Sequence, residues 1–235
     1  MKPTLWILPV AAMAAMGGCV VVDGPSETRT YANTGFDRIR AGGGIDVVLN
    51  QGAFAVSAEA PEGRLDMIEI EQNGSELKLG RKSEWNWFGS RGRYVVNVTA
   101  PAVTAINASG GADVDVRELQ GSSLSIDASG GADIDLANIQ VATLSINSSG
   151  GSDIELSGTC QTARINASGG GDVNGERLSC ADVTAEASGG ADIDVQATTA
   201  AAGNASSGGD IRFIGSPSKI VEQESSGGDV SVEAR

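Results

Sequence analysis

The second half of the chain repeats one short turn sequence seven times: a serine and a glycine pair, closed by an aspartate and then valine or isoleucine. Successive copies start 20, 20, 19, 20, 19 and 19 residues apart. A fixed period of this size is typical of solenoids, in which each repeat is one coil that buries its apolar side only by stacking on its neighbours. The serines that open the copies are Ser109, Ser129, Ser149, Ser168, Ser188, Ser207 and Ser226, the last two in a shortened form of the turn.

Apolar and polar residues alternate on both sides of each turn, which predicts two strands per coil. When the copies are aligned, the apolar residues fall into columns that face inward, and the polar residues between them face water. The inward columns are Ile106, Ile126, Ile146 and Ile165 before the turn, and Val114, Ile134, Ile154, Val173, Ile193, Ile211 and Val230 after it. We therefore predict an all-β solenoid of parallel strands with coils of about 20 residues, over residues 101–235.

Residues 36–100 contain shorter alternating runs separated by glycine and asparagine, and these predict strands. Asn73 and Gly74 lie between two such runs and indicate a hairpin, because both residues accept positive φ. The segment Gly42–Val47 looks like a degenerate copy of the repeated turn. We expect this region to form the opening coils of the solenoid and its cap.

Residues 1–18 have the pattern of an export signal, with Lys2, an apolar stretch and small residues directly before Cys19. This pattern is similar to a bacterial lipoprotein signal, which implies that Cys19 is lipidated and that residues 19–35 form a polar tether. Several acyl chains would hold such a protein at a membrane. An ordinary secretory signal and a retained membrane span are the alternatives. Val20 stands where inner-membrane lipoproteins carry aspartate, so the resemblance implies the outer membrane of a Gram-negative cell envelope.

The composition excludes two classes of function. The 235 residues carry a net charge of -14, which would repel a nucleic acid backbone, so we expect no nucleic acid partner. The chain has no histidine, which excludes nucleophile activation by histidine and removes the commonest transition-metal ligand.

Several motifs resemble the bacterial family described as putative auto-transporter adhesin, head GIN domain. They are Phe36-x-x-Ile39, Gly44-Ile45-Asp46-Val47, Leu77-x-Leu79, the strand from Val95 to Pro101 and the serial Ser-Gly-Gly turns, and together they extend over about residues 35–235. The resemblance implies a single-stranded right-handed parallel β-helix carried by envelope lipoproteins. It implies little about activity.

An aspartate closes every turn, so stacking would bring carboxylates to about 4.8 Å from one another and make them repel. Bound calcium would offset this repulsion, since hard cations favour clustered carboxylate oxygens. The alternative is that each aspartate folds back on the amides of its own turn and is otherwise solvated. The candidate calcium ligands are Asp113, Asp133, Asp153, Asp172, Asp192, Asp210 and Asp229. Apart from calcium, we expect no cofactor.

Cys160 and Cys180 are 20 residues apart, and each lies eight residues before a repeat serine. They therefore occupy equivalent positions on adjacent coils, within the Cα separation that a disulfide allows, and an exported protein meets oxidising conditions. We predict a disulfide, with two buried thiols as the alternative.

A second candidate for a contact surface is an aromatic and basic segment formed by Trp85, Trp87, Phe88 and Arg91. Exposed aromatic residues beside arginine suit contact with a protein or a carbohydrate. The alternative is that Trp87 and Phe88 plug an open part of the solenoid.

Three functions fit the sequence. The first is a non-enzymatic envelope lipoprotein that presents a rigid β-helix for adhesion, surface contact or envelope assembly. The second is a calcium-binding structural module. The third is a polysaccharide-active enzyme, which is disfavoured because the coils have nearly uniform length and leave no long insertions to build a cleft. Since no cap is evident after the last repeat, we also expect end-to-end self-association through exposed strand edges.

Overall fold

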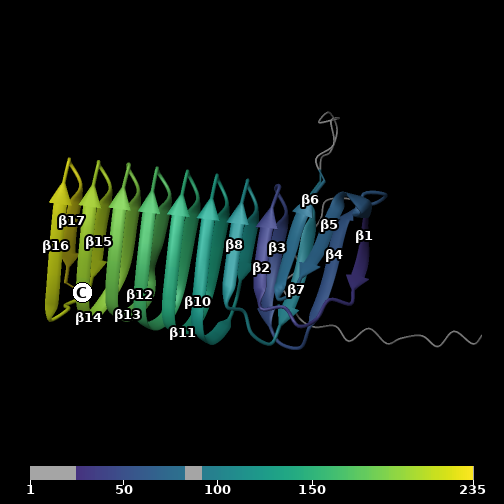
Figure 1. Cartoon of the computed structure of the whole chain (residues 1–235), viewed down its shortest axis with the longest axis horizontal. Coiled ribbons are helices and arrows are strands. Elements are labelled where there is room, and N and C mark those ends of the chain that lie inside the picture. Colours follow the sequence, from purple (N-terminus) through teal and green to yellow (C-terminus); the bar gives the residue numbers. More distant parts are fainter. Residues whose placement is uncertain (1–24, 83–91, 235) are drawn as a thin grey trace, which may run out of the picture.

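The computed structural model describes residues 25–82 and 92–234, which fold into a β-solenoid with its strands side by side along the long axis (Figure 1). Its 17 strands form one continuous sheet that wraps around the core. The elements are β1 Ser26–Tyr31, β2 Arg38–Gly42, β3 Asp46–Gln51, β4 Ala55–Pro61, a 3-10 helix Leu65–Met67, β5 Ile68–Asn73, β6 Glu76–Arg81, β7 Val95–Ala100, β8 Ala105–Ser109, β9 Asp113–Val116, β10 Leu119–Ser129, β11 Asp133–Ser149, β12 Asp153–Ser168, β13 Asp172–Ser188, β14 Asp192–Ser206, β15 Asp210–Ile214, β16 Lys219–Ser225 and β17 Asp229–Glu233.

Each coil has two corners. The first is the glycine corner, formed by the repeated Ser-Gly-Gly turn. At the second corner the long strands β11 to β14 bend without interruption from one face of the solenoid to the other (Figure 1). We call the faces the pre-turn face, which leads into the glycine corner, and the post-turn face, which follows it. The register between β11 and β12 shifts between Leu136 and Ile139, where the chain rounds the second corner.

The predicted inward columns are confirmed by the register of the parallel strands. Ile126 pairs with Ile106 on one side and Ile146 on the other, and all three are fully buried. On the post-turn face Ile134 pairs with Val114 and Ile154, which are buried as well. Because strands of equal direction stack in register, every coil adds one more apolar layer to a single continuous core.

The glycine corner depends on stacking as well as on backbone conformation. Gly189 has a φ of +72°, and a Cβ at this residue would lie 3.0 Å from the backbone N of Gly169 in the coil before it. A side chain would therefore be strained by the positive φ and would also push two coils apart. The carbonyl of Ser188 accepts a hydrogen bond of 3.1 Å from the N–H of Gly169, which fixes the spacing of the two corners.

The last two turns are not shortened, contrary to the sequence-based alignment. Ser206, not Ser207, pairs with Ser188, and Ser225, not Ser226, pairs with Ser206. Ser207 and Ser226 take the place of the first glycine, with φ values of 55° and 53°. The turn keeps its length, and the shortening lies in the strands before it: β14 has 15 residues where β13 has 17.

The degenerate turn at Gly42–Val47 is a full coil of the solenoid, as expected. β2 pairs in parallel with β8, and β3 pairs in parallel with β9, so that Ile39 stacks on Ile106 and Asp46 stacks on Asp113. These partners are far apart in sequence because the chain leaves the first coil after β3, forms β4 to β7 on one side of it, and reaches its other side only at β8.

The intervening chain caps the N-terminal end. β6 and β7 continue the parallel stack on β2 and β3, after which β5 and β4 add antiparallel strands. The predicted hairpin is present, with Gly74 and Ser75 between β5 and β6. Two expectations were wrong. One of the alternating runs that predict strands extends from Leu65 to Ile70, but its first part, Leu65–Met67, is a 3-10 helix. Part of the predicted tether is β1, which pairs antiparallel with β4. β1 has no buried residue, so its strand carries no apolar alternation in the sequence.

Cys160 and Cys180 form a disulfide at the second corner of adjacent coils, with their Cα atoms 4.5 Å apart. They occupy one column with Val141 and Ala197 in the neighbouring coils. Both cysteines are buried, so the bond is shielded from solvent.

We expect the double variant Cys160→Ala/Cys180→Ala to fold and to lose about 3 kcal/mol of unfolding free energy, because the disulfide closes a loop of 20 residues in the unfolded chain. Alanine fits the column, as Ala197 shows. Urea denaturation measures the loss. A reducing agent should lower the midpoint of the unmodified protein and leave that of the variant unchanged; equal midpoints with and without reductant would contradict the bridge.

Candidate functional site

The post-turn face carries two outward columns of mainly acidic side chains. The first column contains the aspartate that closes each turn, and the structure stacks all seven predicted residues in register, with Asp46 of the first coil joining them. The second column lies two residues further along each strand. The first column is Asp46, Asp113, Asp133, Asp153, Asp172, Asp192, Asp210 and Asp229, and the second contains Asp115, Asp135, Glu155, Asn174, Asp194 and Arg212.

The middle part of these columns forms a shallow groove of about 560 Å³, which we call the acidic groove. Its lining residues are Arg93, Asp113, Val114, Asp115, Asp133, Ile134, Asp135, Asp153, Ile154, Glu155, Asp172 and Asn174. Val114, Ile134 and Ile154 of the lining belong to the inward column, so their side chains face the core and the strand backbone forms the base of the groove. The groove therefore offers two rows of mainly acidic side chains on the outer surface of the strands.

The carboxylates affect one another's protonation. Burial raises the pKa of Asp113 above its usual value, and the charges of Asp46 and Asp133 raise it further, while Arg93 opposes the shift. Burial likewise raises the pKa of Asp192, followed by repulsion from Asp172 and Asp210. Charge repulsion along the column is thus a property of the folded protein.

Arginines lie at both ends of the acidic strip. At the N-terminal end Arg93 donates a 2.6 Å hydrogen bond from Nε to Oδ2 of Asp46. Towards the C-terminal end Arg212 stands in the second column after Asp194 and is followed there by Ser231, so the acidic residues of this column end at Asp194. A smaller pocket of about 270 Å³ lies around this arginine, and its lining residues are Asp192, Asp194, Asp210, Ile211, Arg212, Asp229 and Ser231.

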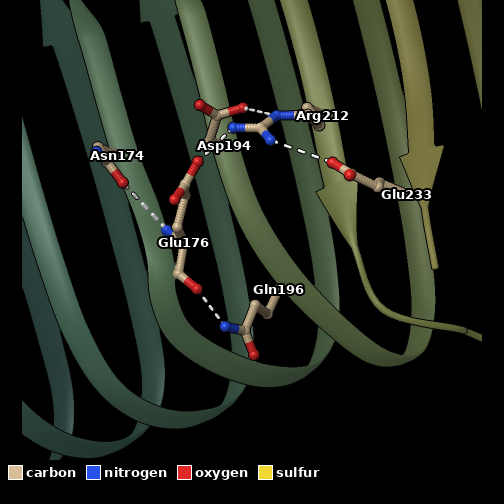
Figure 2. Close-up of polar contacts among 6 residues, drawn as sticks. All are labelled: Asn174, Glu176, Asp194, Gln196, Arg212 and Glu233. Carbon is tan, nitrogen blue, oxygen red and sulfur yellow. Dashed lines mark hydrogen bonds and ion pairs between the residues drawn. The ribbon is translucent and has the colours of Figure 1, made fainter. Parts of the chain in front are cut away.

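Arg212 connects carboxylates from three other strands (Figure 2). Its Nε donates to Asp194 at 2.8 Å, its Nη1 donates to Glu233 at 3.2 Å, and its Nη2 donates to Glu176. These bonds raise the pKa of the Arg212 guanidinium, with the bond to Asp194 as the largest cause. Because β13, β14, β15 and β17 all contribute, the arginine links four successive layers of the stack.

Glu176 is held by two further contacts in this network (Figure 2). Its backbone N–H donates to Oδ1 of Asn174 at 3.2 Å, and its carbonyl accepts a hydrogen bond from Gln196. Sequence reasoning missed the part played by Glu176, because this residue lies at the second corner and not in a repeated column. The break in the acidic column at Arg212 was the signal that could have revealed the network.

The calcium hypothesis stays a prediction. Among the residues that the structure describes, no three acidic or cysteine side chains are grouped as a metal ion would require. The carboxylate of Asp172 instead accepts a hydrogen bond of 3.1 Å from the backbone N–H of Asp192 in the next coil. The carboxylate thus bonds to the neighbouring coil, and not to its own turn as the alternative interpretation supposed.

The other predicted site residues lie outside the described part of the chain. Cys19 falls within residues 1–24, and Trp85, Trp87, Phe88 and Arg91 fall within residues 83–91. Within residues 25–82 and 92–234, no helix has the length and apolar character needed to span a membrane.

We expect Asp113→Asn to raise the free energy of unfolding at pH 7 by about 0.5 kcal/mol. Two carboxylates at a spacing of about 4.8 Å in water repel by roughly 0.9 kcal/mol, and screening by salt reduces this repulsion. A raised pKa means that the folded protein binds its proton at a higher pH than the unfolded chain does. The charged Asp113 carboxylate therefore lowers the stability of the folded protein at neutral pH. This loss of stability is relieved as the pH falls through the raised pKa towards 3.8 and the carboxylate takes up its proton.

Urea denaturation from pH 7 to pH 3 measures this effect. The gain from Asp113→Asn should shrink on acidification and in high salt. Glu62→Gln, which removes a charge from an exposed loop residue, is the control and should have little effect. A loss of stability in Asp113→Asn at pH 7 would mean that this carboxylate is stabilising, as a bound cation would make it.

Three solved structures share this architecture. A putative adhesin from Bacteroides fragilis is 23% identical, with a TM-score of 0.81 over 88% of this chain and 96% of its own. A putative adhesin from Parabacteroides merdae is 19% identical, with a TM-score of 0.69 over 89% and 97% of the two chains. A putative lipid binding protein from Parabacteroides distasonis is 21% identical, with a TM-score of 0.67 over 89% and 97%. At these identities the likeness shows the fold.

No curated protein matches the sequence. The model of one family does match, and it extends over residues 35–217, from the first coil to the segment before β16. That range contains the degenerate coil, the N-terminal cap apart from β1, and the acidic groove. The chain therefore belongs to the family described as putative auto-transporter adhesin, head GIN domain.

Proposed function

We propose that this protein is a non-enzymatic lipoprotein of the cell envelope that makes contact with other surfaces through the acidic groove. Membership of an adhesin family, together with the adhesin neighbours, supports an adhesion-like role at the cell surface or in the envelope. The observation that carries the proposal is the double column of carboxylates, because stacking repeats the same charged group at a fixed spacing across several coils.

The geometry of the groove favours binding over catalysis. Its carboxylates repeat from coil to coil and lie on a flat strand face, so adjacent layers offer similar environments. A glycoside hydrolase needs two carboxyl groups whose environments differ, one protonated and one ionised, on opposite sides of the scissile bond. A repeated column suits an extended partner with several positive charges, whose contacts add along its length.

The lipid anchor is the second part of the proposal. Cys19 would be acylated and would hold the solenoid at the outer membrane of a Gram-negative bacterium, as the small residues before it suggest. Because β1 belongs to the folded cap, the tether is shorter than expected and ends before Ser26. The cap would then lie close to the membrane, and the repeats would extend away from it.

Neutralising two groove residues, in Asp133→Asn/Asp153→Asn, should weaken binding of a cationic partner about fivefold, corresponding to roughly 1 kcal/mol. A fluorescent deca-lysine peptide, followed by anisotropy at physiological salt, is the probe. The matched control, Asp127→Asn/Asp182→Asn, removes two outward carboxylates from the pre-turn face and leaves the same net charge. Equal affinities of the two variants would show that binding follows net charge and not the groove.

Replacing the acceptor of the lipid, in Cys19→Ser, should move the full-length chain from the membrane fraction to the soluble fraction and abolish labelling by radioactive palmitate. The unmodified chain is the control, expressed in the same Gram-negative host. Protease treatment of intact cells then distinguishes a surface location, in which the solenoid is cleaved, from a periplasmic one, in which it is protected. Membrane retention of the unlabelled variant would contradict the lipid anchor.

A further inference from the structure

The last layer at the C-terminal end of the solenoid carries charged residues at positions that are apolar or glycine in the layer before it. β16 pairs in register with β14, so that Ile220, Glu222 and Glu224 align with Ala201, Gly203 and Ala205. The three residues of β14 are buried and face the core. Since parallel strands in register direct paired residues to the same side, two carboxylates occupy core positions at this end.

The end of the core is already filled from the other strands. A Cβ on Gly203 would lie 2.8 Å from Cγ1 of Val230 and 2.9 Å from Cε2 of Phe213. Phe213 of β15 and Val230 of β17 therefore occupy the space that a larger side chain in β14 would need. These two side chains cover the inner face of β14, and β16 adds no buried residue of its own.

Glu224 also covers the edge of the opposite strand. Its Oε1 accepts a hydrogen bond of 3.0 Å from the backbone N–H of Val230 in β17. An end strand presents unpaired N–H and C=O groups, and inward-pointing charges are one means by which natural sheets block pairing at such edges. The carboxylate of Glu224 thus spans the end of the core from one face to the other.

Within the described part of the chain, the strand at the opposite end of this face, β5, provides no counter-charge for these carboxylates. In a head-to-tail stack β16 would meet β5, whose sequence Ile68–Asn73 contains Glu69 and Glu71 and no lysine or arginine. Ile68 and Ile70 pair with Arg81 and Leu79 of β6. A second copy would therefore place Glu222 and Glu224 beside apolar or acidic side chains, which removes their hydration without supplying a counter-charge.

We propose that Glu222 and Glu224 close the C-terminal end of the solenoid against stacking by a second copy of this chain. The proposal reverses the sequence-based expectation of end-to-end self-association. The exposed apolar side chains of this strand, Ile220 and Val221, are 46% and 56% exposed, so β16 would be adhesive without its two glutamates. The closed end would keep the protein monomeric while the acidic face remains free.

The test compares the full-length chain carrying Cys19→Ser, which prevents acylation, with the same chain carrying Glu222→Val/Glu224→Val. Analytical ultracentrifugation over a wide concentration range measures association, and electron microscopy shows whether particles join end to end. The parent should remain a monomer. The apolar variant should associate at least about tenfold more tightly, because its inner face resembles that of the internal coils.

Two controls make the result decisive. Asp210→Asn/Asp229→Asn removes the same number of charges from the outer face of the last coils and should stay monomeric. If the valine variant does not fold, as judged by circular dichroism and a cooperative thermal transition, Glu222→Ala alone keeps the bond between Glu224 and Val230 and should show a smaller increase. End-to-end association of the parent, a folded valine variant that stays monomeric, or equal association of the outer-face control would each overturn the proposal.

Discussion

The parallel hydrogen-bonded register between coils is the constraint on which the rest of the structure depends. Each residue stacks on its equivalent in the next coil, so any side chain in the repeat is presented as a column and not as a single group. Apolar residues gain from this arrangement because every layer buries the one before it. Acidic residues are destabilising in this arrangement, because each carboxylate lies one strand spacing away from like-charged neighbours.

The molecule tolerates this repulsion by breaking the column at chosen places. Asn174 takes a position in the second column where Asp135 and Glu155 precede it, and Arg212 takes another. The arginine joins carboxylates of three strands and stabilises the layers nearest the C-terminal end. The groove between Arg93 and Asn174 keeps its charge, and this is the surface that we propose for contact.

The repeat region could be predicted from its periodicity because the coils stack in register. The place of a residue within its repeat therefore determines which column of the solenoid it joins. The columns that contain Ile126 and Ile134, and the paired cysteines, follow from spacing alone. The last turns were misaligned because the glycine pair was used as the reference, whereas the register follows Ser206 and places Ser207 at positive φ. Positive φ is uncommon for residues other than glycine, so the sequence does not indicate that a serine adopts it.

The N-terminal cap and the C-terminal end could not be read in the same way. β1 is a polar edge strand whose partner, β4, is distant in sequence, and no alternation marks it. Glu222 and Glu224 look like ordinary surface residues until the register with β14 places them on the inner face. Ends of a solenoid break the repeat by necessity, so the pattern that predicts the coils carries no information about them.

The separation between the first two coils has a consequence for the order of folding. Neighbouring repeats are about 20 residues apart, but Asp46 must find Asp113 across 67 residues, at an additional loop-closure cost of about 1 kcal/mol. During synthesis the first coil emerges early, while its neighbours β6 and β7 in the cap follow 38 and 49 residues later (Arg38 to Glu76, Asp46 to Val95) and β8 and β9 later still. The repeats can nucleate one another locally, so the N-terminal coil should join a stack that has already formed. The part of the chain made first would then be among the last to become stable.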